Sequence, residues 1–279
     1  MALSDLFDRA ERTIRILRCR PQRIPKLIKD RRAIQHVEAA PEARNVLSSL
    51  GDLRLLSHSD LLQLREVAVH HVYCEPMFMP QAGWTIIDVG ANIGIYSAWC
   101  LSLMRRGNLL AIEAIPHTYT ALLHNLDSKR NPGAVIECVN IAVARESGEL
   151  AFLVDDTNSA VSRSEISIRE DKAFESIGTF SNGHVHAETL DHVVSAASLP
   201  FRSKAIDVLK IDIEGMEVDC LAGASRTLSR TRRLIFEYHS LELRLRAAHI
   251  LKKAGFREVR ERRMQGSTTV GLSFWLRRP

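Results

Sequence analysis

Two residue patterns alternate along this chain from Trp84 onward. Short runs of aliphatic and β-branched residues alternate with longer segments in which apolar side chains recur at helical spacing. Strands separated by helices form βαβ units, so we predict an α/β fold with a mostly parallel sheet covered on both faces. The strand and helix pairs lie at 85–89 and 93–104, 109–112 and 116–129, 205–213 and 216–228, and 234–238 and 241–254, with one more strand at 135–143.

The end of the chain breaks this alternation. After Gly255, two strand-like runs at 256–260 and 268–276 follow each other without a helix between them. Such a pair must form an antiparallel hairpin, which places a reversed strand in an otherwise parallel sheet. Residues 155–184 are polar and poorly periodic, and a loop of this length in a compact domain is usually functional. We therefore predict a lid or substrate loop over 155–184.

Positive charge is concentrated at the start of the chain. The whole chain has a net charge of +5, but residues 1–32 alone hold ten basic residues against four acidic ones. Apolar residues from Leu3 to Leu17 recur at helical spacing, which predicts a basic amphipathic helix ending before Pro21. Either this helix packs its apolar stripe on the main domain, or it makes a peripheral contact with anionic lipid headgroups. We expect no nucleic-acid partner, because no aromatic residues lie among the arginines as stacking platforms.

These patterns divide the chain into two expected parts, a basic helical extension over residues 1–72 and a folded domain over residues 73–279. The longest apolar stretch, 86–104, contains an acidic and an amide side chain and two glycines, which argues against a membrane span. The five cysteines are scattered without CxxC pairs, which suits a reducing compartment. We expect a cytoplasmic protein, with peripheral attachment to the inner membrane surface through residues 1–32 as the alternative.

The segment I-I-D-V-G-A-N-I-G, residues 86–94, carries the clearest chemical motif. It is typical of a buried strand that runs into a glycine turn and then a helix. Gly90 and Gly94 allow tight turning and close approach of a ligand, and Asp88 can accept a hydrogen bond from a cationic amino group. The G-x-x-x-G spacing differs from the G-x-G-x-x-G of dinucleotide sites, which argues against NAD. Glu113 ends the next strand, where a carboxylate can bind both hydroxyls of a ribose.

Several segments, in this order along the chain, resemble the FkbM family of S-adenosylmethionine-dependent methyltransferases. The most specific are D-V-G-A-N-I-G at 88–94 and K-I-D-I-E-G-M-E at 210–217, and the resemblance covers residues 73–256. It implies the class I methyltransferase fold, a Rossmann-like sheet of seven mostly parallel strands with an antiparallel last strand. It also implies S-adenosyl-L-methionine as the cofactor.

The resemblance assigns a cofactor site residue by residue. Asp88 and the turn at 90–94 would surround the methionine part, and Glu113 would bind the ribose. Asn140 and Ile141 would border the adenine. The usual E-P-x-P of the family is here E-A-I-P, so the wall beside the ribose differs from the family pattern. The expected cofactor-binding residues are Asp88, Gly90, Ala91, Asn92, Gly94, Tyr96, Ser97, Glu113, Ala114, Asn140, Ile141 and Asp212.

Two further strand ends bring titratable side chains to the carboxyl edge of the sheet, where ligands of α/β folds bind. They end in K-I-D-I-E at 210–214 and F-E-Y-H at 236–239. Methyl transfer to oxygen requires the donor carbon and the acceptor oxygen to be held in line while the acceptor loses its proton. Beyond these strands, we expect Glu217 and Asp219 to be helix-surface acids. The expected catalytic residues are Lys210, Glu214, Glu237 and His239.

Two mechanisms fit these residues. In the first, His239 is the general base, and Glu237 or Glu214 orients it. In the second, a metal set of Asp212, Glu237 and His239 binds a divalent ion such as Mg²⁺, which lowers the pKa of the acceptor hydroxyl. Lys210 belongs to the site or is a structural ion-pair partner of Glu214.

The sequence therefore predicts an S-adenosylmethionine-dependent O-methyltransferase that acts on a hydroxyl of a sugar, glycan or glycosylated metabolite, as many members of the resembling family do. A carboxyl or nitrogen acceptor is the alternative within the same activity. A different class of hypothesis is a membrane-surface or partner-binding module with a vestigial cofactor domain. The complete set of acidic residues at the strand ends, together with His239, argues against that loss of activity.

Overall fold

The computed structural model describes most of the chain after residue 72. The basic helix expected within residues 1–32 and most of the loop expected at 155–184 lie outside the described residues. Among the helices that are described, none is long and apolar enough to cross a membrane. The described residues are 72–127, 131–155, 163–164, 180–264 and 267–278, together with several positions between 54 and 67.

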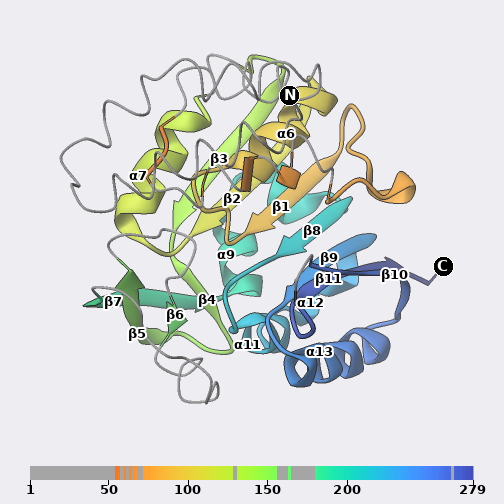
Figure 1. Cartoon of the computed structure of the whole chain (residues 1–279). Coiled ribbons are helices and arrows are strands. Elements are labelled where there is room, and N and C mark those ends of the chain that lie inside the picture. The colour runs from red at the N-terminus through yellow and green to blue at the C-terminus, as the bar shows by residue number, and fades with distance from the viewer. Residues whose placement is uncertain are drawn as a thin grey trace, which may run out of the picture.

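Seven strands form the main sheet (Figure 1). They are β1 (Thr85–Val89), β2 (Gly107–Glu113), β3 (Ala134–Asn140), β8 (Val208–Ile211), β9 (Arg233–Tyr238), β10 (Phe256–Arg263) and β11 (Gly271–Arg277). Their order across the sheet is β10-β11-β9-β8-β1-β2-β3. The five strands from β9 to β3 in this order are parallel, whereas β11 runs antiparallel to both β9 and β10. The hairpin expected after Gly255 and the seven-stranded, mostly parallel fold class are therefore confirmed.

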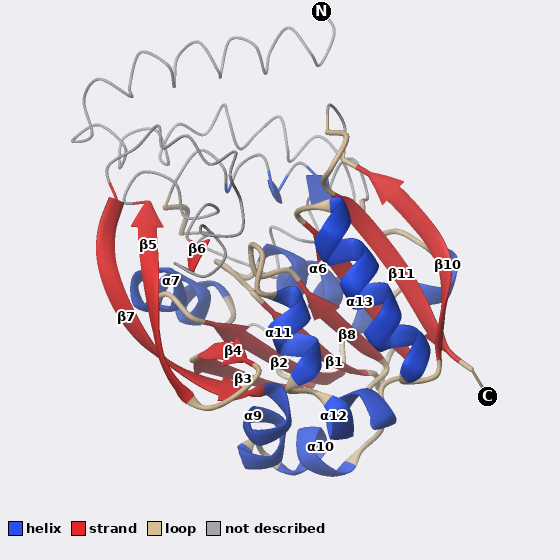
Figure 2. Cartoon of the chain, turned by 90° about the horizontal axis from the view of Figure 1, so that it is seen from below, coloured by secondary structure: helices blue, strands red, loops and turns tan. Residues whose placement is uncertain are grey.

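Helices cover both faces of the main sheet because the strands send alternate side chains into two cores. They are α6 (Ile95–Met104), α7 (Pro116–Asn125), α9 (Leu190–Ala196), α10 (Leu199–Ser203), α11 (Glu217–Ala222), α12 (Ser225–Arg230) and α13 (Leu241–Lys253), and a short 3-10 turn, η2 (Pro76–Phe78), precedes β1. From β1, Ile86 packs in the first core with α6 and α7. Ile87 and Val89 pack in the second core, with α9 to α13 (Figure 2).

A second, four-stranded sheet stands beside the main one, and the sequence patterns do not predict it. It contains β4 (Ala142–Ala144), β5 (Gly148–Asp155), β6 (Arg163–Ser164) and β7 (Phe180–Thr189), in the order β4-β7-β5-β6. The strand expected at 135–143 divides at Ile141, where the chain leaves the main sheet and enters the second one. The two ends of the loop expected at 155–184 belong to β5 and β7, so that prediction was wrong at both ends. Among the described side chains of β7, only Ala187 is buried, so this strand carries no run of aliphatic residues like those of the main sheet.

The single helix expected at 216–228 is two short helices, α11 and α12, which are separated at Gly223. A Cβ on Gly223 would lie 2.4 Å from the carbonyl oxygen of Ala144 in β4. The chain therefore passes too close to the second sheet for a side chain at this position. The first of the two helices, α11, begins at Glu217, soon after β8 ends at Ile211 (Figure 2).

The described positions between 54 and 67 pack on the main domain. Leu55, Leu64 and Val67 are buried in the core that contains α6. The buried amide of Asn125, the last residue of α7, accepts a hydrogen bond from the backbone N–H of Arg54 and donates one to its carbonyl oxygen. This part of the expected extension is therefore attached to the sheet by burial and hydrogen bonds, while the boundary at residue 72 stays a prediction.

Candidate active site

A cavity opens at the carboxyl edge of the main sheet. Its walls come from the ends of β1, β2 and β8, from the second sheet and from one residue of the amino-terminal segment. A concave site at this edge is the usual place for ligands of parallel α/β sheets. The lining residues are Gln63, Val89, Gly90, Asn92, Ile112, Glu113, Ala114, Ile115, Ile141, Ala142, Val143, Leu150, Asp212, Ile213, Glu214 and Met216.

Gly90 brings the ends of β1 and β8 into direct contact. Its φ is +75°, and a Cβ at this position would lie 1.7 Å from the carbonyl oxygen of Asp212. The backbone N–H of Asp212 donates to the carbonyl oxygen of Val89 at 3.0 Å, which fixes the same contact from the other side. A positive φ and a close backbone approach both require glycine here. The lip of β1 therefore offers bare backbone to the cavity, as the sequence predicts.

Glu113 ends β2 and points its carboxylate across the turn after β1. Its Oε2 accepts from the N–H of Asn92 at 3.0 Å, and its Oε1 accepts from the N–H of Ile115 at 2.9 Å. Burial outweighs these hydrogen bonds and raises the pKa of Glu113 to about 7. Each carboxylate oxygen keeps a free lone pair, so a vicinal diol could donate to both.

Asn92 adds an unsatisfied polar atom to the same wall. Its backbone is left-handed, with a φ of +50°. Its side-chain Oδ1 is buried and has no hydrogen-bond partner among the described residues. A buried amide oxygen without a partner is costly, so its position at the cavity indicates a ligand that donates a hydrogen bond there.

A buried ion network lies directly behind this lip. The ammonium of Lys210, whose side chain is 2% exposed, lies 3.2 Å from Asp88 Oδ1 and 3.3 Å from Asp212 Oδ2. The hydroxyl of Ser97 donates to the second oxygen of Asp88 at 2.7 Å. Burial disfavours the ammonium, but the two carboxylates raise the pKa of Lys210 above its ordinary value. The lysine is therefore a permanent cation that holds two strand ends together.

This network changes two expectations from the sequence. Lys210 does not pair with Glu214, because the register of β1 and β8 places Lys210 directly opposite Asp88. Asp88 is fully buried and does not line the cavity. It therefore lies behind the lip, out of contact with the cavity. Its described role is to fix Lys210, and through Lys210 the carboxylate of Asp212.

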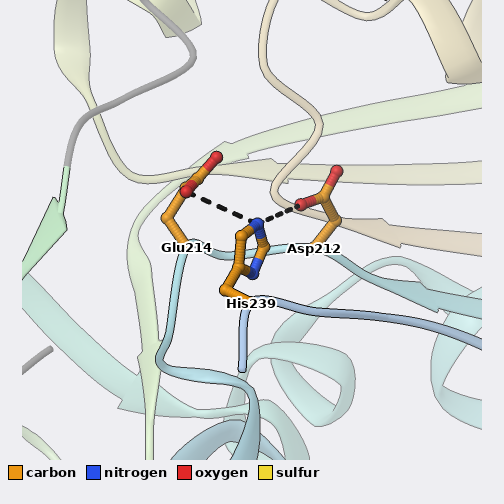
Figure 3. Close-up of side chains that lie close together, drawn as sticks. All are labelled: Asp212, Glu214 and His239. Atoms are coloured by element: carbon orange, nitrogen blue, oxygen red, sulfur yellow. Dashed lines mark ion pairs between the residues drawn. The ribbon is translucent and has the colours of Figure 1, made fainter. Parts of the chain in front are cut away.

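His239 follows β9 and points between two carboxylates at the lip (Figure 3). Its Nε2 lies 3.4 Å from Glu214 Oε2 and 4.0 Å from Asp212 Oδ1, and the side chain is 9% exposed. Its Nδ1 lies 2.7 Å from Glu217 Oε1. Burial favours the neutral ring, but the carboxylates of Glu214 and Glu217 outweigh it and hold the pKa of His239 well above its ordinary value.

Glu217 is not a helix-surface acid, so that prediction was wrong. It is fully buried, and its Oε1 also accepts from the N–H of Gly215 at 2.9 Å. The turn before α11, with Glu214 at a φ of +52°, folds the first residue of the helix back beneath β9. No periodicity in the sequence marks this reversal. Asp219, by contrast, forms an ion pair with Arg145 at 3.0 Å at the surface.

Glu237 lies near Asp212 and His239. Its Oε2 accepts from the hydroxyl of Tyr73 at 3.5 Å. Burial and the neighbouring carboxylate of Asp212 raise the pKa of Glu237 well above its usual range. Among the described residues, the group with metal-ligand spacing is Asp212, Glu214 and His239, so Glu214 replaces Glu237 in the expected metal set.

The remaining predicted cofactor residues divide between the cavity wall and its support. Ala114 and Ile141 line the cavity. The amide of Asn140 lies behind them and donates to the carbonyl oxygens of Glu113 and Ala114. Ala91, Gly94, Tyr96 and Ser97 are not among the lining residues. Gln63, Leu150 and Met216 also line the cavity and were not among the expected site residues, although Met216 lies within the K-I-D-I-E-G-M-E segment.

A family model described as the methyltransferase FkbM domain matches residues 88–258, which is more than half of the chain. The chain belongs to the FkbM methyltransferase family. The match includes the strand ends that carry Asp88, Glu113, Asp212 and His239. The family resemblance inferred from the motifs is therefore confirmed.

Two curated relatives are similar over part of their length. The hexuronic acid methyltransferase AglP of Haloferax volcanii is 27% identical over 153 residues, which cover 55% of this chain and 55% of AglP. The 2-O-methyltransferase NoeI of Sinorhizobium fredii is 27% identical over 164 residues, which cover 57% of this chain and 64% of NoeI. This FkbM chain thus matches less than two thirds of either relative.

The solved structures to which the chain is similar are more distant in sequence. A methyltransferase FkbM from Methylobacillus flagellatus is 15% identical, with a TM-score of 0.44 over 87% of this chain and 60% of that one. A fibrillarin from Aeropyrum pernix, in complex with S-adenosyl-L-methionine, is 11% identical, with a TM-score of 0.44 over 77% of this chain and 74% of that one. With scores this low, the fold assignment for this family member rests on its own strand order.

The ion network predicts a large stability effect at Lys210. Replacing it by methionine, Lys210→Met, leaves Asp88 and Asp212 buried beside each other without a cation. We expect the free energy of unfolding at pH 7, measured by urea denaturation, to fall by about 3–5 kcal/mol. The exposed control Lys204→Met should change it by less than about 0.5 kcal/mol. Adding Asp88→Asn to Lys210→Met should recover part of the loss, and a loss below about 1 kcal/mol would contradict the assigned role.

Proposed function

We propose that this protein transfers a methyl group from S-adenosyl-L-methionine to a hydroxyl of a sugar, glycan or glycosylated metabolite. The observation that carries the proposal is the placement of two chemistries on one cavity. A diol-binding carboxylate, Glu113, and the bare turn at Gly90 lie on one side, and Asp212 and Glu214, with His239 next to them, lie on the other. The family and the printed activities of AglP and NoeI support the same proposal.

The cavity fits the cofactor on observations of this structure. The turn at Gly90 leaves no room for a side chain, so backbone can approach the methionine part closely. Asn92 offers its buried, unpaired Oδ1 to a donor such as the amino group. Glu113 can accept from both ribose hydroxyls. An apolar wall suited to an adenine ring completes the cavity and consists of Ile115, Ile141, Val143 and Leu150.

The charge of the site suits a cationic ligand as well. Carboxylates outnumber cationic groups around the lip, and two of them, Asp88 and Glu217, are fully buried in a low-dielectric environment. A sulfonium and an ammonium bring positive charge to such a site, which compensates for the excess of acids. The carboxylates are Asp88, Asp212, Glu214, Glu217 and Glu237, and the cationic groups are Lys210 and His239.

S-adenosyl-L-methionine, when bound, supplies an electrophilic methyl group. The residues of this chain must hold an acceptor hydroxyl in line with that group and take up the proton that the hydroxyl loses. Asp212 and Glu214 are the cavity acids next to His239 Nε2, so they are placed to accept a hydrogen bond from the hydroxyl. Glu217 keeps Nδ1 of His239 engaged, which turns Nε2 toward the same point.

A carboxyl acceptor is the second candidate, and one comparison favours it. The name of AglP specifies a hexuronic acid, and such a sugar carries both hydroxyl and carboxyl groups. The product separates the two cases, because a methyl ester is cleaved by mild alkali and a methyl ether is not. The carboxylates at the lip favour the neutral hydroxyl, since they repel an anionic acceptor group.

The pKa of Glu113 predicts a pH-dependent affinity for the product S-adenosylhomocysteine. With a pKa of about 7, Glu113 is mostly protonated at pH 6 and mostly ionised at pH 8. Only the ionised form can accept from both ribose hydroxyls, so the affinity measured by calorimetry should rise about tenfold between these pH values.

The variant Glu113→Gln isolates this effect. It should bind S-adenosylhomocysteine about 10- to 100-fold more weakly at pH 8, because it loses hydrogen bonds to a charged group. Its affinity should also lose the tenfold rise. The exposed matched control, Glu146→Gln, should keep both the affinity and the pH dependence. If Glu113→Gln retained the full pH dependence, another group would be responsible and the ribose assignment would fail.

Turnover provides the direct test of the proposed activity. Neutral sugars, uronic acids and glycosides incubated with the protein and S-adenosyl-L-methionine should include one that gains the mass of one methylene in an alkali-stable form. His239→Ala should lower that turnover at least about 100-fold, while the affinity for S-adenosylhomocysteine stays near wild type. The exposed control His192→Ala should retain activity. Full activity of His239→Ala would remove His239 from the mechanism.

A further inference from the structure

Two carboxylates and an imidazole nitrogen meet at the lip of the cavity in an arrangement typical of metal ligands. We propose that Asp212, Glu214 and His239 bind a divalent cation at the carboxyl edge of the main sheet. This inference rests on the proposed function, because the ion would serve the same acceptor hydroxyl. It differs from the set expected from the sequence in using Glu214 and not Glu237.

The spacing of the ligand atoms is close to what one ion requires. One oxygen from each acid and one nitrogen of His239 all lie within 4.8 Å of one another. Carboxylate oxygens and imidazole nitrogens bind divalent ions at about 2.0–2.2 Å, so ligand atoms up to about 4.4 Å apart can share one. Nε2 lies 3.4 Å from Glu214 Oε2 and 4.0 Å from Asp212 Oδ1, so both of these pairs meet the limit (Figure 3).

His239 is held in the orientation that a metal ligand requires. Its Nδ1 is 2.7 Å from Glu217 Oε1, and this oxygen is itself fixed by the N–H of Gly215. A proton on Nδ1 donated to Glu217 leaves the lone pair on Nε2. Metal-binding histidines commonly donate their other ring N–H to a carboxylate in this way. The ring is 9% exposed, and its Nε2 is aimed between the two acids, so either a proton on Nε2 or a cation bound between the three groups satisfies them.

The two acids present one oxygen each to the same point. Lys210 binds Asp212 Oδ2, which leaves Oδ1 directed toward His239. Glu214 reaches the cluster from a residue with a φ of +52°, a conformation that non-glycine residues adopt rarely and that often marks functional sites. A relaxed backbone at this residue would direct the chain elsewhere. The left-handed conformation of Glu214 is therefore what directs its side chain toward the other two ligands.

The ligand set also indicates the kind of ion and its purpose. Carboxylates suit Mg²⁺ and Mn²⁺, and an imidazole is accepted more readily by Mn²⁺ and later divalent metals. Asp212 and Glu214 line the cavity, so an ion bound to them has coordination positions open toward the acceptor. A hydroxyl that occupies such a position becomes more acidic and is held in a fixed place.

Mn²⁺ serves as the probe for this site. The full-length protein, stripped with a chelator, is titrated with Mn²⁺ while free Mn²⁺ is followed by electron paramagnetic resonance. We expect saturable binding of one ion per chain. Glu214→Gln and His239→Ala should each weaken it at least about tenfold, and Glu217→Gln about 10- to 100-fold. Glu146→Gln, the same change at an exposed acid, should have no effect. Glu214 is 27% exposed, so its substitution tests the site without opening the core.

The outcomes separate this site from the proposed function, because the binding of S-adenosylhomocysteine is measured in parallel on the same protein. Absence of saturable Mn²⁺ binding, or equal binding by Glu214→Gln and wild type, overturns the cation site. If the nucleoside still binds in that case, the proposed activity stands with a proton on Nε2 in place of the metal. If Mn²⁺ binding is lost with Glu214 and His239 but the nucleoside does not bind, the cation site stands and the proposed function fails.

Discussion

The ammonium of Lys210 is the group on which the carboxyl edge of the sheet depends. It lies between Asp88 at the end of β1 and Asp212 at the end of β8, and it is shielded from water by the rings of Tyr73 and Tyr96. A charge pair in such surroundings is costly to separate, because neither partner can be hydrated where it stands. The relative position of the two strand ends is therefore set before any ligand enters the cavity.

The backbone around this ion network is also held in specific conformations by its neighbours. Gly90 packs against the carbonyl oxygen of Asp212, and Asn92 and Glu214 both adopt left-handed conformations beside the cavity. Strained residues of this kind persist when their neighbours determine their position. Here the neighbours are the hydrogen bond from Asn92 to Glu113 and the buried pair of Glu217 and His239. The positions of the side chains at the site thus depend on several local backbone contacts together with the ion network of Lys210.

The sequence predicts the fold and the cavity better than it predicts the acid cluster. The βαβ alternation and the reversed hairpin depend on local periodicity, which a single sequence shows directly. Glu113 and Gly90 were assigned correctly to the cavity wall because strand ends in a parallel sheet meet at one edge. The burial of Glu217 and the partner of Lys210 depend on register and on a sharp turn after β8, and neither leaves a periodic signal. The second sheet was missed because β4 and β6 are too short to show a periodic pattern and because, of the described side chains of β7, only Ala187 is buried.

The second sheet has a consequence for how such a protein can diversify. The chain leaves the main sheet at Ile141 and returns to it through Thr189, the N-cap of α9, so the second sheet is an insertion between two fixed points. Ala142, Val143 and Leu150 from this insertion form part of the cavity wall. Substitution, lengthening or exchange of the insertion would reshape that wall and leave the strand order and the ion network of the main sheet unchanged. The architecture thus separates the part that can change from the part that must stay fixed.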